Sequence, residues 1–275
     1  MRVAVVGHVE WIEFARVERV PLPGEIVHAG EGWEEPGGGG AVAAVQLARL
    51  AGDALFFTAL GDDDTGRRAH EELERLGVRV AVAWRAEPQR RAFVHVDSAG
   101  ERTITVIGER LGPRGSDPLP WHELAQMDAV YFTAGDAGAV RAARSAGTLV
   151  ATARAIDVLA EAEVRLDALV SSSRDAGERY EPGALNPPPL LVARTAGAEG
   201  GAFETADGRS GRWPPVPVPG PPRDAYGAGD CFAAGLTLGL GDGRSVEDAL
   251  HLGARCGAAA MTGRGAYAAQ LRSPD

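Results

Sequence analysis

The chain has 275 residues, of which 45% are hydrophobic, and its formal net charge at pH 7 is −10. These values predict a globular protein of one large domain, or one domain with a small appendage, and they argue against a nucleic-acid partner held through its phosphates. No apolar run approaches the roughly 18 residues that a membrane helix needs, so no membrane partner is expected. The two cysteines, Cys231 and Cys256, favour a cytoplasmic protein with buried thiols over a disulfide framework.

The basic residues are all arginine, because the 28 Lys and Arg residues include no lysine. A P-loop needs Gly-Lys-Ser/Thr, a protein kinase needs a strand lysine, and a Schiff base needs a lysine amine. These three kinds of site are therefore excluded.

The first third of the chain predicts strands interrupted by two helices. Residues 3–7 form an apolar run typical of a central strand, and residues 11–35 alternate loosely between apolar and charged side chains, which indicates short half-exposed strands. Four glycines, Gly37 to Gly40, then open an alanine- and leucine-rich helix that extends to about Leu50. The next elements expected are a strand at 53–60, a helix at 67–76, and strands at 78–84, 91–97 and 102–107.

From residue 120 onward the predicted strands and helices alternate. This alternation predicts a mostly parallel sheet covered by helices on both faces. The extra strands within 11–35 and 80–110 would form a smaller β lid. The alternating strands are expected near 128–133, 147–151, 167–171 and 190–195, with a hairpin at 200–213, and the helices near 137–146, 155–163, 174–180, 228–240 and 245–261.

The most informative motif runs from Asp224 to Asp230, with the sequence Asp-Ala-Tyr-Gly-Ala-Gly-Asp, and a helix of small residues follows it. Backbone N–H groups at such a turn converge on an anion, and the helix dipole adds positive potential. Asp230 beside a bound phosphate is suited to accept a proton from a substrate hydroxyl. A cradle for an anion together with a base favours phosphoryl transfer to an alcohol. The alternative is a tight glycine turn with Asp230 stabilising the helix start.

This motif resembles the C-terminal motif of the PfkB, or ribokinase-like, carbohydrate kinases, and the resemblance extends from Val3 to Ala266. It implies an α/β fold, a ribokinase-like three-layer α/β/α sandwich with a mostly parallel central sheet and a small β-sheet lid, in a single kinase domain over residues 1–275. It also implies an ATP- and Mg²⁺-dependent phosphotransferase acting on an alcohol group of a small sugar, polyol or nucleoside-like substrate. K⁺ is a further candidate cofactor, and a homodimer through the lid is a candidate assembly. The implied catalytic residues are Gly227, Ala228, Gly229 and Asp230.

The region from Gly37 to Leu50, followed by Gly61 to Gly66, resembles the family's first motif, in which glycines let the backbone approach sugar hydroxyls. The position of the family's sugar-binding Asn is Val42 here, and the position of its frequent substrate-binding Asp is Ile12. Glu10 and Glu13 flank Ile12, and Glu10 is the preferred replacement because it lies nearer the strand end. The alternative is an ordinary glycine loop with ordinary lid residues. The substrate contacts implied are Glu10, Gly38, Gly39, Gly40 and Val42.

Two regions resemble the family's nucleotide and metal site. Residues 195–200 resemble the strand-end Thr-x-Gly-x-x-Gly that lies along ATP. Where the family often has Asn-x-x-Glu, this chain has Ser173 and Ala176, so Asp175 is a candidate carboxylate, or else Ser173 simply caps a helix. The last helix and its loop, 258–266, resemble the segment near the adenine and a monovalent cation. The nucleotide contacts implied are Thr195, Gly197, Gly200, Ser173 and Gly257, and the metal ligands Asp175 and Asp224.

Two other functions stay open at this point. The changes at Ile12, Val42, Ser173 and Ala176 motivate a kinase-fold protein that binds a nucleotide or metabolite with little catalytic activity. A dinucleotide-dependent oxidoreductase is the third option, but its Gly-x-Gly-x-x-Gly fingerprint would need glycine where Phe232 stands.

Overall fold

A computed structural model describes residues 1–273. Nine strands form a large sheet in the order β13-β12-β11-β10-β9-β8-β1-β4-β5. Neighbours from β11 to β5 in this order run parallel, whereas β12 and β13 are antiparallel additions at one edge. The strands are β1 (Val3–Val6), β4 (Leu55–Gly61), β5 (Arg79–Arg85), β8 (Ala129–Phe132), β9 (Thr148–Thr152), β10 (Ala168–Ser172), β11 (Leu191–Thr195), β12 (Gly201–Thr205) and β13 (Ser210–Trp213).

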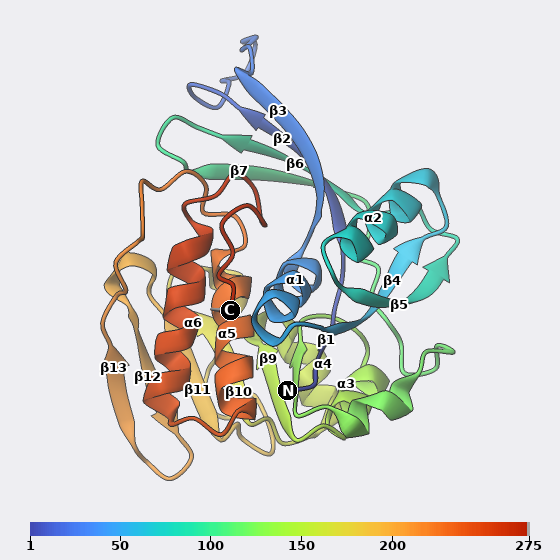
Figure 1. Ribbon diagram of the computed structural model, residues 1–275, viewed down its shortest axis with the longest axis vertical. Coiled ribbons are helices and arrows are strands. Elements are labelled where there is room, and N and C mark those ends of the chain that lie inside the picture. Colours follow the sequence, from blue (N-terminus) through green and yellow to red (C-terminus); the bar gives the residue numbers. More distant parts are fainter. Residues whose placement is uncertain (274–275) are drawn as a thin grey trace.

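Helices cover both faces of this sheet (Figure 1). β1 shows why, because its four residues are all buried and successive side chains point to opposite faces. Val3 and Val5 pack with one set of helices, and Ala4 and Val6 pack with the other. The first set is α1 (Gly39–Ala51), α2 (Asp64–Arg75), α5 (Ala228–Gly241) and α6 (Val246–Ala260), and the second is α3 (Ala137–Ala143) and α4 (Ile156–Ala162).

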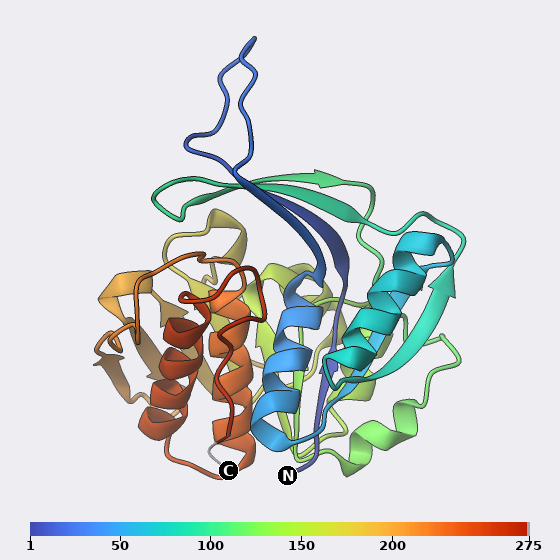
Figure 2. The same cartoon turned by 45° about the horizontal axis from the view of Figure 1, so that its top comes forward.

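A second sheet of four strands, the lid, has the order β3-β2-β6-β7. It lies across the end of the molecule opposite the two chain termini, and the connection between β2 and β3 projects away from it (Figure 2). Phe14 stacks on Trp33 within the lid and meets the ring of Tyr226 edge-on, with ring centroids 4.7 and 5.5 Å apart. The lid therefore packs directly on the turn that precedes α5. Its strands are β2 (Glu10–Arg16), β3 (Glu31–Gly37), β6 (Arg91–Val96) and β7 (Arg102–Ile107).

The three-layer fold, the mostly parallel sheet and the smaller β-sheet are confirmed. The helix predicted at 174–180 is wrong, since only a 3₁₀ turn, η3 (Ala176–Glu178), forms there. A glycine at 177 and the prolines that begin at 182 give this segment little capacity to continue a helix. Three further 3₁₀ turns were not predicted, η1 (Trp121–Gln126), η2 (Ala153–Ala155) and η4 (Gly197–Glu199).

Two expectations from composition can be compared with the structure. Cys231 and Cys256 are both free and buried, as predicted. Among residues 1–273, no helix has the length and apolar character that crossing a bilayer requires.

Candidate active site

The turn before α5 has a conformation that only glycine accommodates easily. Gly227 has φ 76°, and a Cβ at this position would lie 2.8 Å from Cγ1 of Val42. Asp224 fixes the approach to the turn, because its carboxylate accepts hydrogen bonds from the N–H groups of Tyr226 and Gly265 at 2.8 and 3.1 Å. Val42 is fully buried beneath this turn. Its side chain therefore supports the turn from below, and a contact with substrate stays a prediction.

The first turn of α5 presents free backbone donors. Within residues 1–273, the N–H groups of Gly227, Gly229 and Asp230 have no protein acceptor, whereas Cys231 donates to the carbonyl of Gly227 at 2.9 Å. Gly229 is exposed, and no atom lies within 4 Å of where its Cβ would be. Open space next to unused donors at a helix start is suited to an anion.

Asp230 lies beside this turn in surroundings that favour its neutral form. Burial raises the pKa of Asp230 to about 7, and the charge of Glu178 contributes in the same direction, against Arg102 and Arg154. A Cβ at Gly39 would lie 2.7 Å from Oδ1 of Asp230, so the start of α1 approaches the carboxyl closely. A carboxyl with a pKa near neutrality is matched to general-base catalysis at physiological pH.

The end of β1 and the start of α1 meet at the same place. Glu10 is buried and forms an ion pair with Arg90, with Oε1 2.8 Å from Nε, and burial raises the pKa of Glu10. His8 is also buried, and burial with nearby arginines lowers its pKa to about 3, which keeps the imidazole neutral. Gly38 donates its N–H to the hydroxyl of Tyr226 at 2.9 Å, and a Cβ at Gly40 would lie 2.7 Å from the carbonyl of His8.

The structure thus brings Glu10, Gly38, Gly39 and Asp230 together, while Glu13 lies on a more exposed part of β2. Both glycines approach an acidic residue closely. A Cβ at Gly38 would lie 3.2 Å from the backbone nitrogen of Glu10, and a Cβ at Gly39 would lie 2.7 Å from Oδ1 of Asp230. Glu13 instead lies 3.7 Å from Arg91 of the lid. This arrangement favours the choice of Glu10 over Glu13 as a substrate contact, which stays a prediction.

The residues expected to contact the nucleotide lie at the carboxyl ends of β10 and β11. Ser173 donates its N–H and its hydroxyl to the carbonyl of Thr195, at 2.9 and 3.0 Å. Gly197 and Gly200 have φ 61° and 78°, which shape the turn that follows Thr195. Gly257 lies in α6 against the first turn of α5, since a Cβ there would lie 3.0 Å from the carbonyl of Ala228. Because the strands are parallel, these ends share one sheet edge with the end of β1.

The two predicted metal ligands are both engaged by protein donors. Asp175 accepts a hydrogen bond from the N–H of Gly177 at 2.8 Å and pairs with Arg154, while Asp224 accepts the two N–H groups described above. Among residues 1–273, no group of three or more acidic, histidine or cysteine side chains could hold a metal ion. This donor set does not form a protein-only site, but it fits a Mg²⁺ ion carried mainly by nucleotide phosphates.

Glu178 and Arg154 were missed as candidate site residues. Glu178 lies two positions beyond Ala176, where the resemblance places a glutamate, so a shift of two residues would have found it. It pairs with Arg154 at 2.9 Å. Arg154 matches no motif in the sequence. Its position directly after β9, close to Glu178, is a result of how the strands are ordered in the sheet.

The sequence is similar to those of known carbohydrate kinases. The profile described as "pfkB family carbohydrate kinase" matches residues 1–180 and 185–272. An ATP-dependent ribose-1-phosphate kinase from Halopiger xanaduensis is 31% identical over 289 residues, covering 98% of this chain and 95% of the relative.

Two solved structures have the same fold. Ribokinase from Thermotoga maritima has a TM-score of 0.80 at 23% identity, covering 99% of this chain and 96% of that chain. Ribokinase from Arabidopsis thaliana, solved with ribose and ATP, has a TM-score of 0.77 at 21% identity, covering 98% and 96%. From the match over nearly all of its length, we conclude that this chain belongs to the PfkB family of carbohydrate kinases.

Proposed function

We propose that the protein transfers the γ-phosphoryl group of ATP to an alcohol of a small sugar, polyol or nucleoside-like substrate. The observation that carries this proposal is Asp230, with a pKa of about 7, beside the free N–H groups at the start of α5. The kinase from Halopiger xanaduensis and the ribokinase bound to ribose and ATP support this substrate class.

In the proposed reaction the substrate hydroxyl gives its proton to the carboxylate of Asp230. The hydroxyl oxygen forms a bond to the γ-phosphorus, the bond to the β–γ bridging oxygen breaks, and ADP leaves. The free N–H groups of Gly227, Gly229 and Asp230 stabilise negative charge on the transferred group, which is the role of a preorganised oxyanion site. The N–H of Ala228, also expected in this role, must first give up a long hydrogen bond of 3.4 Å to the carbonyl of Ala225. Mg²⁺ on the phosphates would neutralise further charge, and Asp175 and Glu178 would bind its waters.

The lid contributes by excluding water from the transferred group. Arg102 of β7 donates to the carbonyl of Ala225, and Phe14 contacts Tyr226, so two lid strands already touch the α5 turn. Exclusion of water from a closed site limits the hydrolysis of ATP.

An enzyme that uses ATP belongs where ATP is abundant, and we therefore place this one in the cytoplasm. We also propose that Asp224 is a ligand of a bound K⁺ ion.

A kinase-fold binding protein with little activity is the second candidate. Ile12 and Val42 replace two polar sugar contacts of the family, and both side chains are fully buried. Neither can hydrogen-bond a sugar, so any sugar contact must come from other groups.

A screen for ADP release separates the two candidates. The purified protein is incubated with ATP, Mg²⁺ and K⁺ over sugars, polyols, nucleosides and their phosphates, and ATP binding is measured in parallel by calorimetry. Release of ADP that requires an acceptor supports the kinase. ATP binding without acceptor-dependent ADP release across the whole panel would instead support the binding protein.

A further inference from the structure

A cavity of about 310 Å³ lies at the carboxyl ends of β8 and β9, next to the proposed site. Thr133 lines it, and a Cβ at Gly7 would lie 2.2 Å from the hydroxyl oxygen of Thr133, so the cavity borders the end of β1. Four of its lining residues are arginines, namely Arg85, Arg110, Arg114 and Arg154, and three are acidic, namely Glu87, Asp136 and Asp157.

The wall of the cavity is firmly held. Arg85 forms a largely buried ion pair with Asp117, with Nη2 2.6 Å from Oδ2, which ties the 111–117 loop to the end of β5. Asp136, another lining residue, accepts hydrogen bonds from the N–H groups of Gly115 and Ala139, both at 2.8 Å. Arg85 and Asp136 are thus satisfied by the protein, which makes them structural.

Arg110 is not satisfied in this way. Within residues 1–273 its guanidinium has neither a carboxylate partner nor a hydrogen-bond acceptor, in contrast to Arg154, which pairs with Glu178, and Arg90, which pairs with Glu10. Arg110 is exposed, and partial loss of surrounding water together with the positive charges of Arg90 and Arg154 lowers its pKa, against the negative charge of Glu10. Three guanidinium groups therefore lie close enough to repel one another.

These arginines also lie close to the reacting groups. The charges of Arg90, Arg110 and Arg154 all act on His8 and Glu10, and Arg154 acts on Asp230 as well. An anion bound among the three would therefore lie near any hydroxyl held against Asp230. Two buried polar atoms at this border, Nδ1 of His8 and the hydroxyl of Thr133, have no hydrogen-bond partner within residues 1–273.

We propose that the acceptor is a phosphorylated sugar, whose phosphate monoester binds in this cavity to Arg110 and Arg154, with Arg90 alongside. Guanidinium groups bind phosphate with paired, charge-assisted hydrogen bonds, and a phosphate monoester carries about −1.5 to −2 charges at pH 7. A neutral sugar would leave Arg110 without a negative charge in contact with it, whereas Arg90 and Arg154 already pair with Glu10 and Glu178. This inference rests on the proposed function and narrows its substrate class.

The resulting reaction leaves the first phosphate untouched. A free hydroxyl of the sugar phosphate loses its proton to Asp230 and bonds to the γ-phosphorus as the bond to the bridging oxygen breaks. The products are ADP and a sugar carrying two phosphates. A reaction that supplies a sugar monophosphate must therefore precede this step, and one that consumes a sugar bisphosphate must follow it.

The test uses binding first and activity second. Calorimetry without nucleotide compares ribose with ribose 1-phosphate and ribose 5-phosphate, fructose with fructose 6-phosphate, and gluconate as a carboxylate. The variant Arg110→Met removes the charge and keeps the aliphatic stem, and Arg75→Met, an exposed arginine on α2, is the matched control. Thermal melts of each variant report on folding.

We expect at least one phosphorylated sugar to bind at least tenfold more tightly than its parent sugar. Arg110→Met should remove most of this preference and raise the KM of the phosphorylated acceptor about tenfold, but leave the affinity for ADP unchanged. Arg75→Met should change neither the preference, nor the KM, nor the affinity for ADP. The proposal is overturned if no sugar phosphate binds, if gluconate is preferred, if Arg110→Met keeps the preference, or if it weakens ADP equally. Binding as expected with no transfer of phosphate would support the anion site and contradict the proposed kinase function.

Discussion

Opposing influences act on the pKa of Asp230, and their balance sets the pH above which its carboxylate can accept a proton. Burial and Glu178 raise the pKa of Asp230 to about 7, while Arg102 and Arg154 favour its charged form. The identity of this residue was predictable from its motif. Its pKa was not, because Glu178 and Arg154 come from η3 and the end of β9, which only the fold brings near.

The pH dependence of activity should follow this carboxyl. Since the base acts only when deprotonated, kcat/KM for the acceptor should rise about tenfold per pH unit below pH 7 and level off above it. A pH–rate profile from pH 5 to 9 measures this. A profile that stays flat down to pH 5 would contradict a base with a raised pKa.

Stability should show the opposite trend at the same residue. The folded pKa of Asp230 exceeds its ordinary value, so its proton favours the folded state and stability is lost as pH rises from about 4 to 7. Asp230→Asn should therefore stabilise the protein at pH 8 by on the order of 1–2 kcal/mol and have little effect at pH 4. Thermal melts at the two pH values measure the difference, and equal changes at both would contradict the pKa.

At the scale of elements, sequence patterns predicted the positions of strands and regular helices more reliably than the conformation of the loops between them. Apolar runs such as Val3–Val6 and Ala129–Phe132 indicate buried parallel strands because both faces of the sheet are covered. The segment after β10 misled the prediction, because Asp175, rather than Ser173, forms the cap, and it caps only a short 3₁₀ turn. The arginine cavity could not be predicted, since it joins Arg110 and Arg114 of the loop after β7 to Arg154 of η2, which is distant in the sequence.

The start of α5 offers a matched pair of glycine substitutions. Gly227→Ala should destabilise the fold by about 1–3 kcal/mol, because it places a side chain at φ 76° and against Val42. Gly229→Ala should change stability by less than about 0.5 kcal/mol, because its Cβ meets open space. It should nevertheless raise the KM for ATP, since that open space is where the phosphates are expected. Denaturant unfolding and initial rates report both effects, and similar destabilisation by the two variants would refute this description of the turn.

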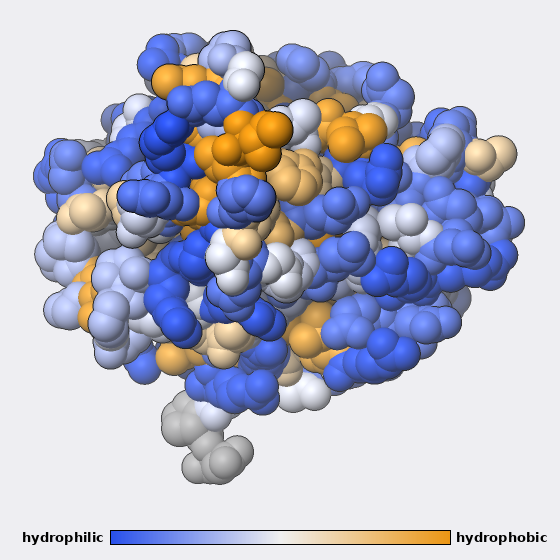
Figure 3. Space-filling view, turned by 90° about the horizontal axis from the view of Figure 1, so that it is seen from above, coloured by the Kyte–Doolittle hydropathy of each residue, from blue (hydrophilic) through white to orange (hydrophobic). Residues whose placement is uncertain are grey.

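At the scale of the whole molecule, the lid has two outer strands, β3 and β7, of which β7 is exposed at every residue. The exposed residues of β7 include the apolar Ile104, Val106 and Ile107. Seen from above, apolar side chains gather among the hydrophilic ones on this end of the molecule (Figure 3). An unpaired apolar edge strand is suited to pairing with a second strand.

Pairing of two lids into a homodimer therefore stays a prediction with a simple test. Light scattering after size exclusion should give twice the 28.6 kDa chain mass, and Val106→Arg should reduce it to the monomer. A monomer for the unaltered protein at about 100 μM would contradict the dimer.

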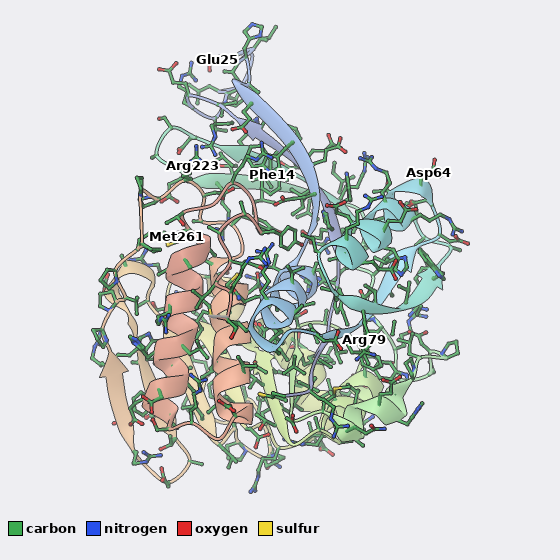
Figure 4. The ribbon with its side chains drawn as sticks, viewed as in Figure 1. Phe14, Glu25, Asp64, Arg79, Arg223 and Met261 are labelled. Atoms are coloured by element: carbon green, nitrogen blue, oxygen red, sulfur yellow. The ribbon has the colours of Figure 1, made fainter. Side chains whose placement is uncertain are left out.

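Contacts between the lid and the C-terminal segments link the two ends of the chain. Arg16, on the same lid strand as Phe14, donates to the carbonyl of Arg223 at 3.5 Å, and Figure 4 labels Phe14 and Arg223. Arg223 in turn donates its N–H to the carbonyl of Met261 at the end of α6. The lid, the α5 turn and the last helix are thus joined around the proposed site, in agreement with a reaction that needs the lid closed.

The most direct test of the account compares the unaltered protein with Asp230→Asn by phosphorus NMR, with ATP, Mg²⁺ and the acceptor found in the screen. The unaltered protein should form ADP and a new phosphate ester, and the variant should lose about 10²–10⁴-fold in rate while still folding and binding ATP. A variant that forms the ester at a near-native rate would contradict the central claim that Asp230 accepts the proton of the substrate hydroxyl.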